Sequence, residues 1–232
     1  MPLYLVSTPI GNRKDITQRA IETLFSVDLI ACEDTRKTGW LLASLSDKEP
    51  PQMIPFHEKN KEEQAANIIK CLQQGKKVAL VSNAGTPTIA DPGFKLVREC
   101  VHLGIPVLTI PGPSAIIAAL SVSGLPTDKF LFLGFLPKKE GKKRKILAAA
   151  KDLVATPLSP TFIFYESPFR LLKTLKLIKA VLGDVEISIC HELTKVHETV
   201  IHGSLDEILR QIKSKKIKGE STVLFKLVPA QS

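Results

Sequence analysis

Acidic and basic side chains follow several short apolar runs of the sequence, where they could act on a bound ligand. The acids that could accept a proton, directly or through a water molecule, are Glu33, Glu166 and Glu198. The cations that could hold phosphate groups are Arg36, Arg170 and Lys195. Taken together, these residues favour a catalytic site for an anionic substrate.

Each of these residues also has a structural interpretation that the sequence leaves open. Glu33 and Asp34 could cap the helix that follows them. Arg170 could be a solvated helix residue, and Lys195 could pair with Glu192. The catalytic interpretation therefore depends on the whole set rather than on one member.

The motifs of several other enzyme classes are missing. His191 and His197 lie six residues apart, whereas the HExxH zinc motif needs four to place both on one helix face. Residues 112–116 lack the second glycine of a serine-hydrolase elbow. No GxG and no GxxxxGK[ST] occurs, which argues against a dinucleotide fold, an ordinary Rossmann methyltransferase and a P-loop hydrolase. The sequence predicts no metal site.

The stretch from residue 78 to residue 94 predicts the floor of a binding site. The apolar run Val78–Val81 leads into the small and polar residues 82–87, and a second loop, 90–93, opens a helix. Ligands of parallel α/β sheets bind at the carboxyl ends of the strands. An ordinary turn with two prolines and two glycines is the alternative.

The elements that must position these loops alternate between strands and helices. The strands predicted for the first half are 3–6, 29–32, 52–56, 78–81 and 107–110. This alternation is typical of a doubly wound, mostly parallel sheet. After Pro111-Gly112-Pro113 we expect a second α/β domain with a mixed sheet, so the predicted domains are 1–113 and 114–232. The strands expected in the second domain lie near 130–135, 162–165, 186–190, 198–202 and 222–228.

Three pairs of residues predict capping boxes at the starts of helices. The pairs are Asp15 with Gln18, Asn60 with Glu63, and Ser204 with Glu207. Gly75 is predicted to end the second of these helices.

The composition indicates a globular protein with a polyanionic partner. The chain has 232 residues, 44% of them hydrophobic, and its net charge of +9 favours nucleic acid. The four cysteines are far apart, which suits a reducing cytosol without disulfides. Residues 104–127 carry no charge but contain four prolines, so we expect a strand, a turn and a buried helix rather than a membrane span.

The loops at the predicted strand ends carry a resemblance to a known family. The motifs are TPIGN at 8–12, CEDTRKT at 32–38, SNAGTPTIADPG at 82–93, PGPSA at 111–115, FYESPFR at 164–170 and HELTKVHE at 191–198. From Leu3 to Val228 the chain resembles the ribosomal RNA small subunit methyltransferase I family, a branch of the tetrapyrrole methylase superfamily. The resemblance implies transfer of a methyl group from S-adenosylmethionine to the 2′-hydroxyl of a cytidine in the decoding region of 16S ribosomal RNA. It also implies a cytoplasmic homodimer of two α/β domains with the cofactor in the cleft between them.

The same resemblance assigns residues to the cofactor. The residues so implied are Pro9, Ile10, Asn83, Ala84, Gly85, Thr86, Ser114, Ala115, Tyr165 and Leu193. The family usually has aspartate where this chain has Asn83, so a charged contact is replaced by an amide that can still form hydrogen bonds. Family members often continue into a basic C-terminal extension, whereas this sequence ends at Ser232.

Two basic clusters predict further contacts with RNA. The first, a possible phosphate-binding lid, comprises Lys138, Lys139, Lys142, Lys143, Arg144 and Lys145. The second comprises Lys213, Lys215, Lys216 and Lys218. A solvated loop is the alternative for the first cluster. Two other functions stay open, namely methyl transfer to a small acceptor such as a tetrapyrrole, and cofactor or RNA binding without catalysis.

Overall fold

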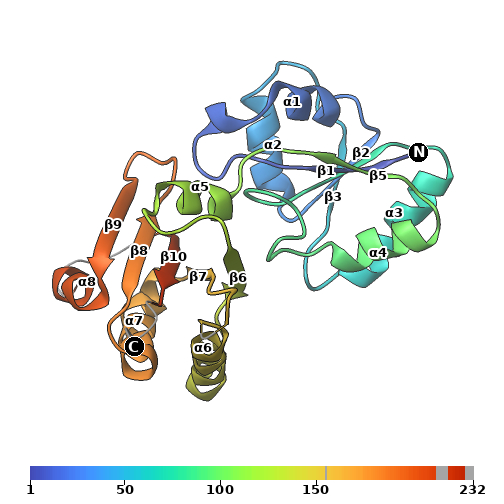
Figure 1. Cartoon of the computed structure of the whole chain (residues 1–232). Helices are drawn as coiled ribbons and strands as arrows, with labels where there is room; N and C mark the ends of the chain where they lie inside the picture. The colour runs from blue at the N-terminus through green and yellow to red at the C-terminus, as the bar shows by residue number, and fades with distance from the viewer. Residues whose placement is uncertain (155, 213–218, 228–232) are drawn as a thin grey trace. The chain divides into compact units, whose positions relative to one another are not determined.

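The chain forms two compact units, residues 1–114 and 115–232 (Figure 1). The computed structural model describes residues 1–154, 156–212 and 219–227. The predicted cluster Lys213, Lys215, Lys216 and Lys218 lies outside the described residues, as does Val228.

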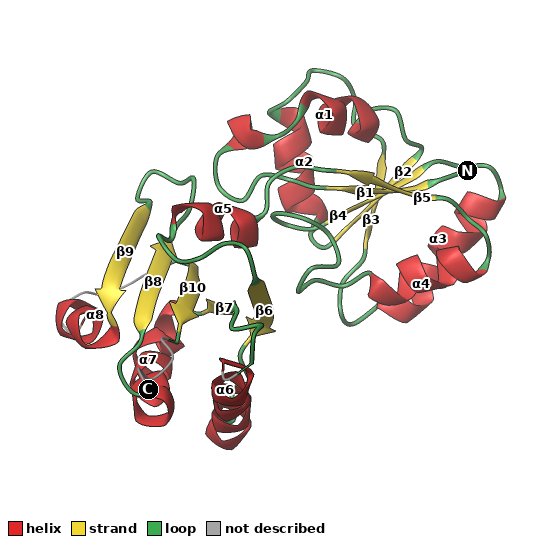
Figure 2. Cartoon of the chain, viewed as in Figure 1, coloured by secondary structure: helices red, strands yellow, loops and turns green. Residues whose placement is uncertain are grey.

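The first unit is built on a parallel sheet, as predicted. Its five strands have the order β3-β2-β4-β1-β5, and every neighbouring pair is parallel (Figure 2). The strands are β1 (Leu3–Val6), β2 (Leu29–Cys32), β3 (Gln52–Pro55), β4 (Val78–Val81) and β5 (Val107–Ile110). Because β4 and β1 are neighbours in the sheet, the loops that follow them emerge side by side at the carboxyl edge.

Helices cover both faces of this sheet. They are η1 (Arg13–Asp15), α1 (Gln18–Leu24), α2 (Thr35–Ala43), α3 (Lys61–Gln73) and α4 (Phe94–His102). Leu24 and Leu42 bring α1 and α2 against one face, whereas Ile68 and Leu96 bring α3 and α4 against the other (Figure 2). The sheet is therefore doubly wound.

Two of the predicted capping boxes are wrong. The first helix begins at Gln18 because the Thr17 hydroxyl oxygen accepts a hydrogen bond from the Ala20 amide at 3.2 Å, and Asp15 lies in a preceding 3₁₀ turn. The Asn60 side chain does not cap α3, because it accepts from the His57 amide at 2.8 Å and donates to a backbone carbonyl behind it. In both cases a nearby polar group offered a competing hydrogen bond.

The second unit contains the predicted mixed sheet. Its order is β6-β7-β10-β8-β9, in which β6 and β7 are parallel and the other pairs antiparallel. The strands are β6 (Phe130–Phe135), β7 (Thr161–Glu166), β8 (Glu186–His191), β9 (Thr199–Ser204) and β10 (Ser221–Lys226). The helices are α5 (Ala115–Val122), α6 (Glu140–Val154), α7 (Pro168–Leu182) and α8 (Leu205–Ile212).

The third capping box is confirmed at the start of α8. The Ser204 hydroxyl accepts from the Glu207 amide at 3.3 Å, and the Glu207 carboxylate accepts from the Ser204 amide at 3.1 Å. The apolar side of α8 packs Leu205, Ile208 and Ile212 into the core of this unit.

The uncharged segment 104–127 contains β5 and α5, in agreement with the prediction. Among the described helices, none combines the length and the hydropathy that a membrane crossing requires. All four cysteines are free.

Candidate functional site

The loops that follow β1 and β4 are joined by hydrogen bonds at the carboxyl edge of the parallel sheet. The amides of Thr8 and Gly85 each donate to the carbonyl of the other, at 3.0 and 2.9 Å. The Thr8 hydroxyl donates to the Ser82 carbonyl at 3.1 Å, and the hydroxyl oxygens of Ser7 and Thr86 lie 3.0 Å apart. This cross-linking fixes the two loops as one rigid base.

The loop after β4 contains several residues with positive φ, a conformation that glycine adopts readily and other residues adopt only with strain. Gly85 has a φ of +78°, and a Cβ there would lie 3.4 Å from the Ile10 side chain. Gly93 has a φ of +138°, and a Cβ there would come within 2.9 Å of Thr88. Thr88 and Ala90 themselves have φ values of +73° and +63°, which are unfavourable for residues with a Cβ. Backbone strain of this kind is common at binding sites.

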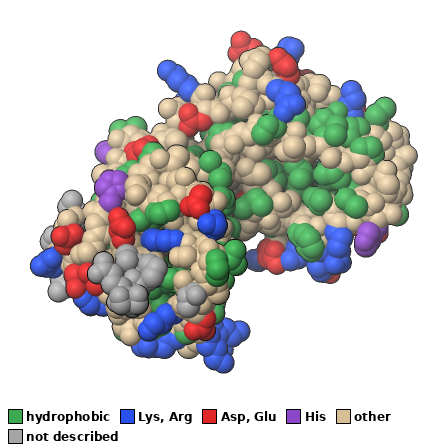
Figure 3. All heavy atoms as spheres, viewed as in Figure 1, with side chains coloured by type: hydrophobic (Ala, Val, Ile, Leu, Met, Phe, Trp, Pro, Cys, Tyr) green, Lys and Arg blue, Asp and Glu red, His purple; other side chains and the backbone are tan. Residues whose placement is uncertain are grey.

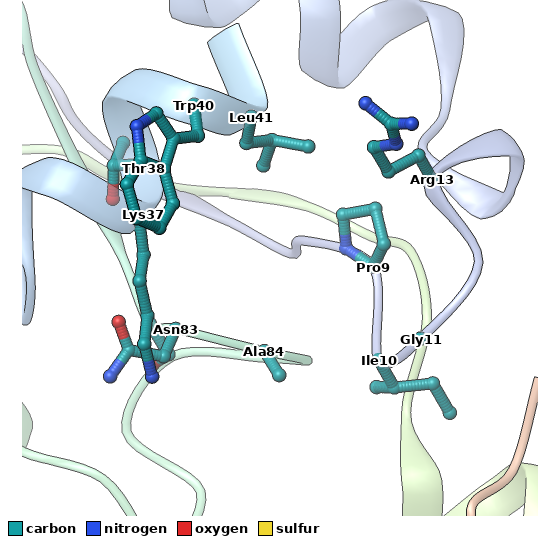
Figure 4. A pocket seen from close by; sticks show the side chains of 11 residues that line it. Pro9, Ile10, Gly11, Arg13, Lys37, Thr38, Trp40, Leu41, Asn83 and Ala84 are labelled. Atoms are coloured by element: carbon teal, nitrogen blue, oxygen red, sulfur yellow. The ribbon is translucent and has the colours of Figure 1, made fainter. Parts of the chain in front are cut away.

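A pocket of about 340 Å³ opens above this base (Figure 4). The β1 and β4 loops form part of its wall, and helix α2 forms the facing part (Figure 4). The lining residues are Pro9, Ile10, Gly11, Arg13, Lys37, Thr38, Trp40, Leu41, Ser82, Asn83 and Ala84.

Asn83 offers this pocket an unused hydrogen-bond acceptor. Its side-chain oxygen is buried, yet it has no hydrogen-bond partner among the described residues. Buried polar atoms are nearly always paired, so an unpaired one in a pocket calls for a ligand. A ligand with an ammonium or amino group would satisfy this oxygen, and S-adenosylmethionine carries both.

The structure brings together only some of the predicted cofactor residues. Pro9, Ile10, Asn83 and Ala84 line the pocket, and Gly85 and Thr86 form the base beneath it through the contacts described above. Thr86 also donates to the Pro113 carbonyl at 3.4 Å, directly before Ser114.

The remaining predicted cofactor residues belong to the second unit or to the junction with it. Ala115 begins α5, immediately after Ser114. The Tyr165 ring packs edge-on against Phe132, with ring centroids 5.0 Å apart. Leu193 is 9% exposed. The role of these four residues stays a prediction.

Sequence reasoning missed the wall that α2 contributes. The CEDTRKT motif drew attention to Glu33 and Arg36, whereas Lys37, Trp40 and Leu41 line the pocket. Their spacing of three and four residues places them on one helix face, which is the signal that could have found them.

The acids and cations around α2 have different surroundings. Asp34 caps the helix by accepting from the Arg36 amide at 3.0 Å, and the Arg36 guanidinium lies 3.2 Å from the same carboxylate. The hydrogen bond from the Arg36 side chain lowers the pKa of Asp34. The Glu33 carboxylate, by contrast, has no hydrogen-bond or ion-pair partner within the described residues. The capping alternative is therefore confirmed for Asp34.

Glu166 is enclosed rather than available for catalysis. Its side chain is 0% exposed and accepts from the Thr174 hydroxyl at 2.6 Å and the Ser167 amide at 2.9 Å. It also pairs with Lys143, whose Nζ lies 3.5 Å away, and with Arg170. Because these partners surround the carboxylate, we assign Glu166 a structural role in place of the predicted catalytic one.

The partners of Glu166 correct two further predictions. Lys143 belongs to the predicted RNA-binding cluster but is buried, and its Nζ also donates to the Thr174 hydroxyl at 2.6 Å. Arg170 is not a solvated residue, because it pairs with Glu166 and donates to the Leu136 carbonyl at 3.3 Å.

The charged residues Glu192, Lys195 and Glu198 form contacts within the loop 192–198. The Lys195 Nζ lies 2.8 Å from the Glu192 carboxylate, which confirms the structural alternative for Lys195. Burial raises the pKa of Glu192, but the hydrogen bonds from Lys195 and the Glu220 amide outweigh this effect and lower it overall. Glu198 accepts from the Thr194 amide. Among the described residues, no cluster of histidine, cysteine or acidic side chains could hold a metal ion.

Comparison with known proteins defines the class to which this fold and site belong. The family model of the Tetrapyrrole (Corrin/Porphyrin) Methylases matches residues 2–209. Cobalt precorrin-4 methyltransferase shares the fold with a TM-score of 0.69 and 18% identity over 98% of this chain and 96% of that one. Uroporphyrin-III C-methyltransferase from Thermus thermophilus, in a structure complexed with S-adenosylhomocysteine, shares the fold with a TM-score of 0.64. The two sequences are 18% identical, and the match covers 97% of each chain.

Sequence similarity narrows the class to one family. A protein of Thermotoga maritima named ribosomal RNA small subunit methyltransferase I is 44% identical over 223 residues, 96% of this chain and 97% of the relative. The protein of that name from Escherichia coli O157:H7 is 46% identical over 232 residues, 99% of this chain and 79% of the relative. The chain belongs to the ribosomal RNA small subunit methyltransferase I family. The two coverages show that relatives with and without additional length carry the same name.

Proposed function

We propose that the protein transfers a methyl group from S-adenosylmethionine to the 2′-hydroxyl of a cytidine in the 16S ribosomal RNA of the small subunit. The observation that carries this proposal is the 44% identity over 96% of the chain to a relative named for this substrate class. The net charge of +9 suits a polyanionic substrate. Methyl transfer to a tetrapyrrole is less favoured, because the solved tetrapyrrole enzymes share only 18% identity.

The residues present fit the cofactor. Pro9, Ile10 and Ala84 offer apolar and backbone contacts, and the unpaired Asn83 side-chain oxygen can accept a hydrogen bond from an amino or ammonium group. When bound, S-adenosylmethionine supplies a methyl group that its sulfonium has already activated. The protein therefore has to align the attacking hydroxyl, on the order of 3 Å from the methyl carbon, and to remove its proton.

Of the three predicted proton acceptors, we propose Glu33. It follows β2 directly at the carboxyl edge of the parallel sheet, and β2 pairs with β4, whose loop lines the pocket. Its carboxylate has no partner among the described residues, whereas Glu166 and Glu198 have theirs. A free carboxylate can accept a proton directly or through water.

The exposed part of the first basic cluster remains available to bind phosphates. Lys138 and Lys139 precede α6, and Lys142 and Lys145 lie exposed in its first turns. Replacing these four lysines by glutamate should reduce RNA affinity and flatten its salt dependence, because each lost phosphate contact lowers the slope by about one unit. Filter binding at several salt concentrations measures both quantities. Unchanged affinity would exclude the lid.

The same proposal includes a cytoplasmic location and a homodimer, and exposed apolar residues of the first unit support the homodimer. Hydrophobic side chains gather on the visible face of the first unit (Figure 3), and Val101, Leu103 and Leu108 are between 45% and 63% exposed. A second copy of the chain would cover such residues. Light scattering of the purified protein should give the mass of two chains, and a single-chain mass would contradict the dimer.

The experiment that tests the function is methyl transfer from labelled S-adenosylmethionine to small ribosomal subunits that lack this modification. Mass spectrometry then maps the product on the RNA. We expect a single 2′-O-methylated cytidine in the decoding region. Cofactor binding without any transfer to the subunits would contradict the proposal and favour a small acceptor or a binding protein without activity.

A further inference from the structure

Trp40 occupies an unusual position in the pocket wall. It is the only tryptophan of the chain, and its residue is 74% exposed although it lines the pocket. On the same helix, Thr38 and Leu42 are buried and hold α2 in place. None of the described aromatic pairs or cation–ring contacts involves the indole. A large, flat apolar ring therefore stands free on a helix that is itself well anchored.

Two cations line the same pocket without a counter-charge. Arg13 and Lys37 are the charged members of the 11 lining residues, and no acid is among them. Within the described residues, neither has a carboxylate in ion-pair distance. In Figure 4, Lys37 lies beside Trp40 on α2, whereas Arg13 begins η1, which follows the β1 loop. A free aromatic ring with unpaired cations near it is the composition of a site for single-stranded nucleic acid, because bases stack on the ring and phosphates meet the cations.

Methyl transfer requires an acceptor site next to the loops that are proposed to hold the cofactor. The acceptor hydroxyl must lie next to the methyl group, so the acceptor nucleotide has to share a pocket with the cofactor loops. The α2 wall faces Pro9 and Asn83 across one pocket, and Glu33 lies just before the helix.

We infer that Trp40 stacks on a base of the substrate RNA at or beside the methylated nucleotide, while Lys37 and Arg13 bind the adjoining phosphates. This inference rests on the proposed function and adds residues that position its acceptor. Trp40, Lys37 and Arg13 are positioning residues, whereas Glu33 acts on the reacting hydroxyl.

The single tryptophan permits a direct optical test. The intact protein is first saturated with S-adenosylhomocysteine and then titrated with a short single-stranded RNA oligonucleotide that has a central cytidine. We expect the RNA to quench the Trp40 fluorescence, and the quenching to weaken as salt rises, because phosphate contacts are screened. Quenching by S-adenosylhomocysteine with no further change on adding RNA would place the cofactor, and not the RNA, on this ring and overturn the inference.

Variants distinguish the contribution of base stacking on Trp40 from that of phosphate contacts with Lys37. Trp40→Ala should raise the KM for small subunits roughly tenfold, as expected for one lost stacked base, and Trp40→Phe should restore part of the loss. Lys37→Ala should lower the slope of affinity against salt by about one unit. The control is Lys76→Ala, an exposed lysine just before β4 at the opposite edge of the sheet, which should leave both values unchanged. Affinity for S-adenosylhomocysteine should stay constant in all four.

The outcomes distinguish a failure of this inference from a failure of the proposed function. If the wild-type protein methylates the subunits and Trp40→Ala has the same KM, the inference is wrong and the function stands. If the wild-type protein transfers no methyl group, the proposed function fails first.

Discussion

At the scale of single residues, Asn83 departs from the rule that buried polar atoms are paired. Its buried side-chain oxygen has no partner among the described residues, which costs the unliganded protein stability. A ligand that donates to this oxygen recovers that cost, so the residue links stability to binding.

Asn83→Ala should weaken S-adenosylmethionine binding roughly fivefold, since one hydrogen bond contributes about 1 kcal/mol. The variant should not lose stability without ligand, because the unpaired oxygen is removed. Asn83→Asp keeps an acceptor and should restore binding. Calorimetric titration and thermal unfolding measure the two effects, and unchanged affinity in Asn83→Ala would show that the cofactor does not meet this oxygen.

Glu33→Gln should lower kcat by about 10²-fold or more while leaving the affinity for cofactor and RNA in place, because an amide cannot take the proton. Single-turnover kinetics on small subunits provide the measurement. Glu49→Gln, which alters an exposed acid in the loop before β3, is the matched control. Equal loss of activity in both variants would argue against a specific role for Glu33.

At the scale of elements, the buried ion pair between α6 and β7 ties the second unit together. Lys143 on α6 reaches Glu166 at the end of β7, and Thr174 on α7 bonds to both. These three consecutive elements thus share one buried polar cluster beside the apolar core of the second unit.

Lys143→Ala should therefore destabilise the protein by about 3 kcal/mol, because it leaves the buried Glu166 charge with fewer partners. Lys145→Ala, an exposed residue on the same helix, should change stability by less than about 0.5 kcal/mol. Urea unfolding compares the two variants. A Lys143→Ala protein as stable as the wild type would mean that the pair contributes nothing to folding.

At the scale of the whole molecule, each unit contains a buried thiol that reports on its stability. Burial raises the pKa of Cys100 in the first unit to about 11, and that of Cys190 in the second unit to about 11, from an ordinary value of 9.0. Below pH 9 both folded and unfolded thiols keep their protons, so this contribution is fully present. Between pH 9 and 11 only the unfolded thiol ionises, and stability falls.

We expect each thiol to lower the free energy of unfolding by on the order of 2 kcal/mol between pH 9 and 11. Cys100→Ala and Cys190→Ala should each remove one part of that decline. Denaturant unfolding at a series of pH values measures it. A decline that is the same in the wild type and in both variants would assign it to other groups.

The sequence by itself determined most of the fold. The apolar runs of four residues separated by helical periods predicted the parallel sheet, and two adjacent strands without a helix between them predicted the mixed one. These features depend on local patterns of apolar residues, which a strand or helix reproduces wherever it lies. The Ser204 capping box also depends on local residues only. At the other two helix starts, a different hydrogen bond replaces the predicted one: the Thr17 hydroxyl caps α1, and the Asn60 side chain accepts from the His57 amide.

Only the tertiary structure decided the roles of the charged residues. Lys143 and Lys145 stand two positions apart in one basic run, yet one is buried against Glu166 and the other is exposed. Asn83 and Trp40 became parts of one pocket because β4 and α2 bring them to the same edge of the sheet. Burial and pairing depend on contacts between segments far apart in the chain. A residue's type and its sequence neighbours do not contain that information.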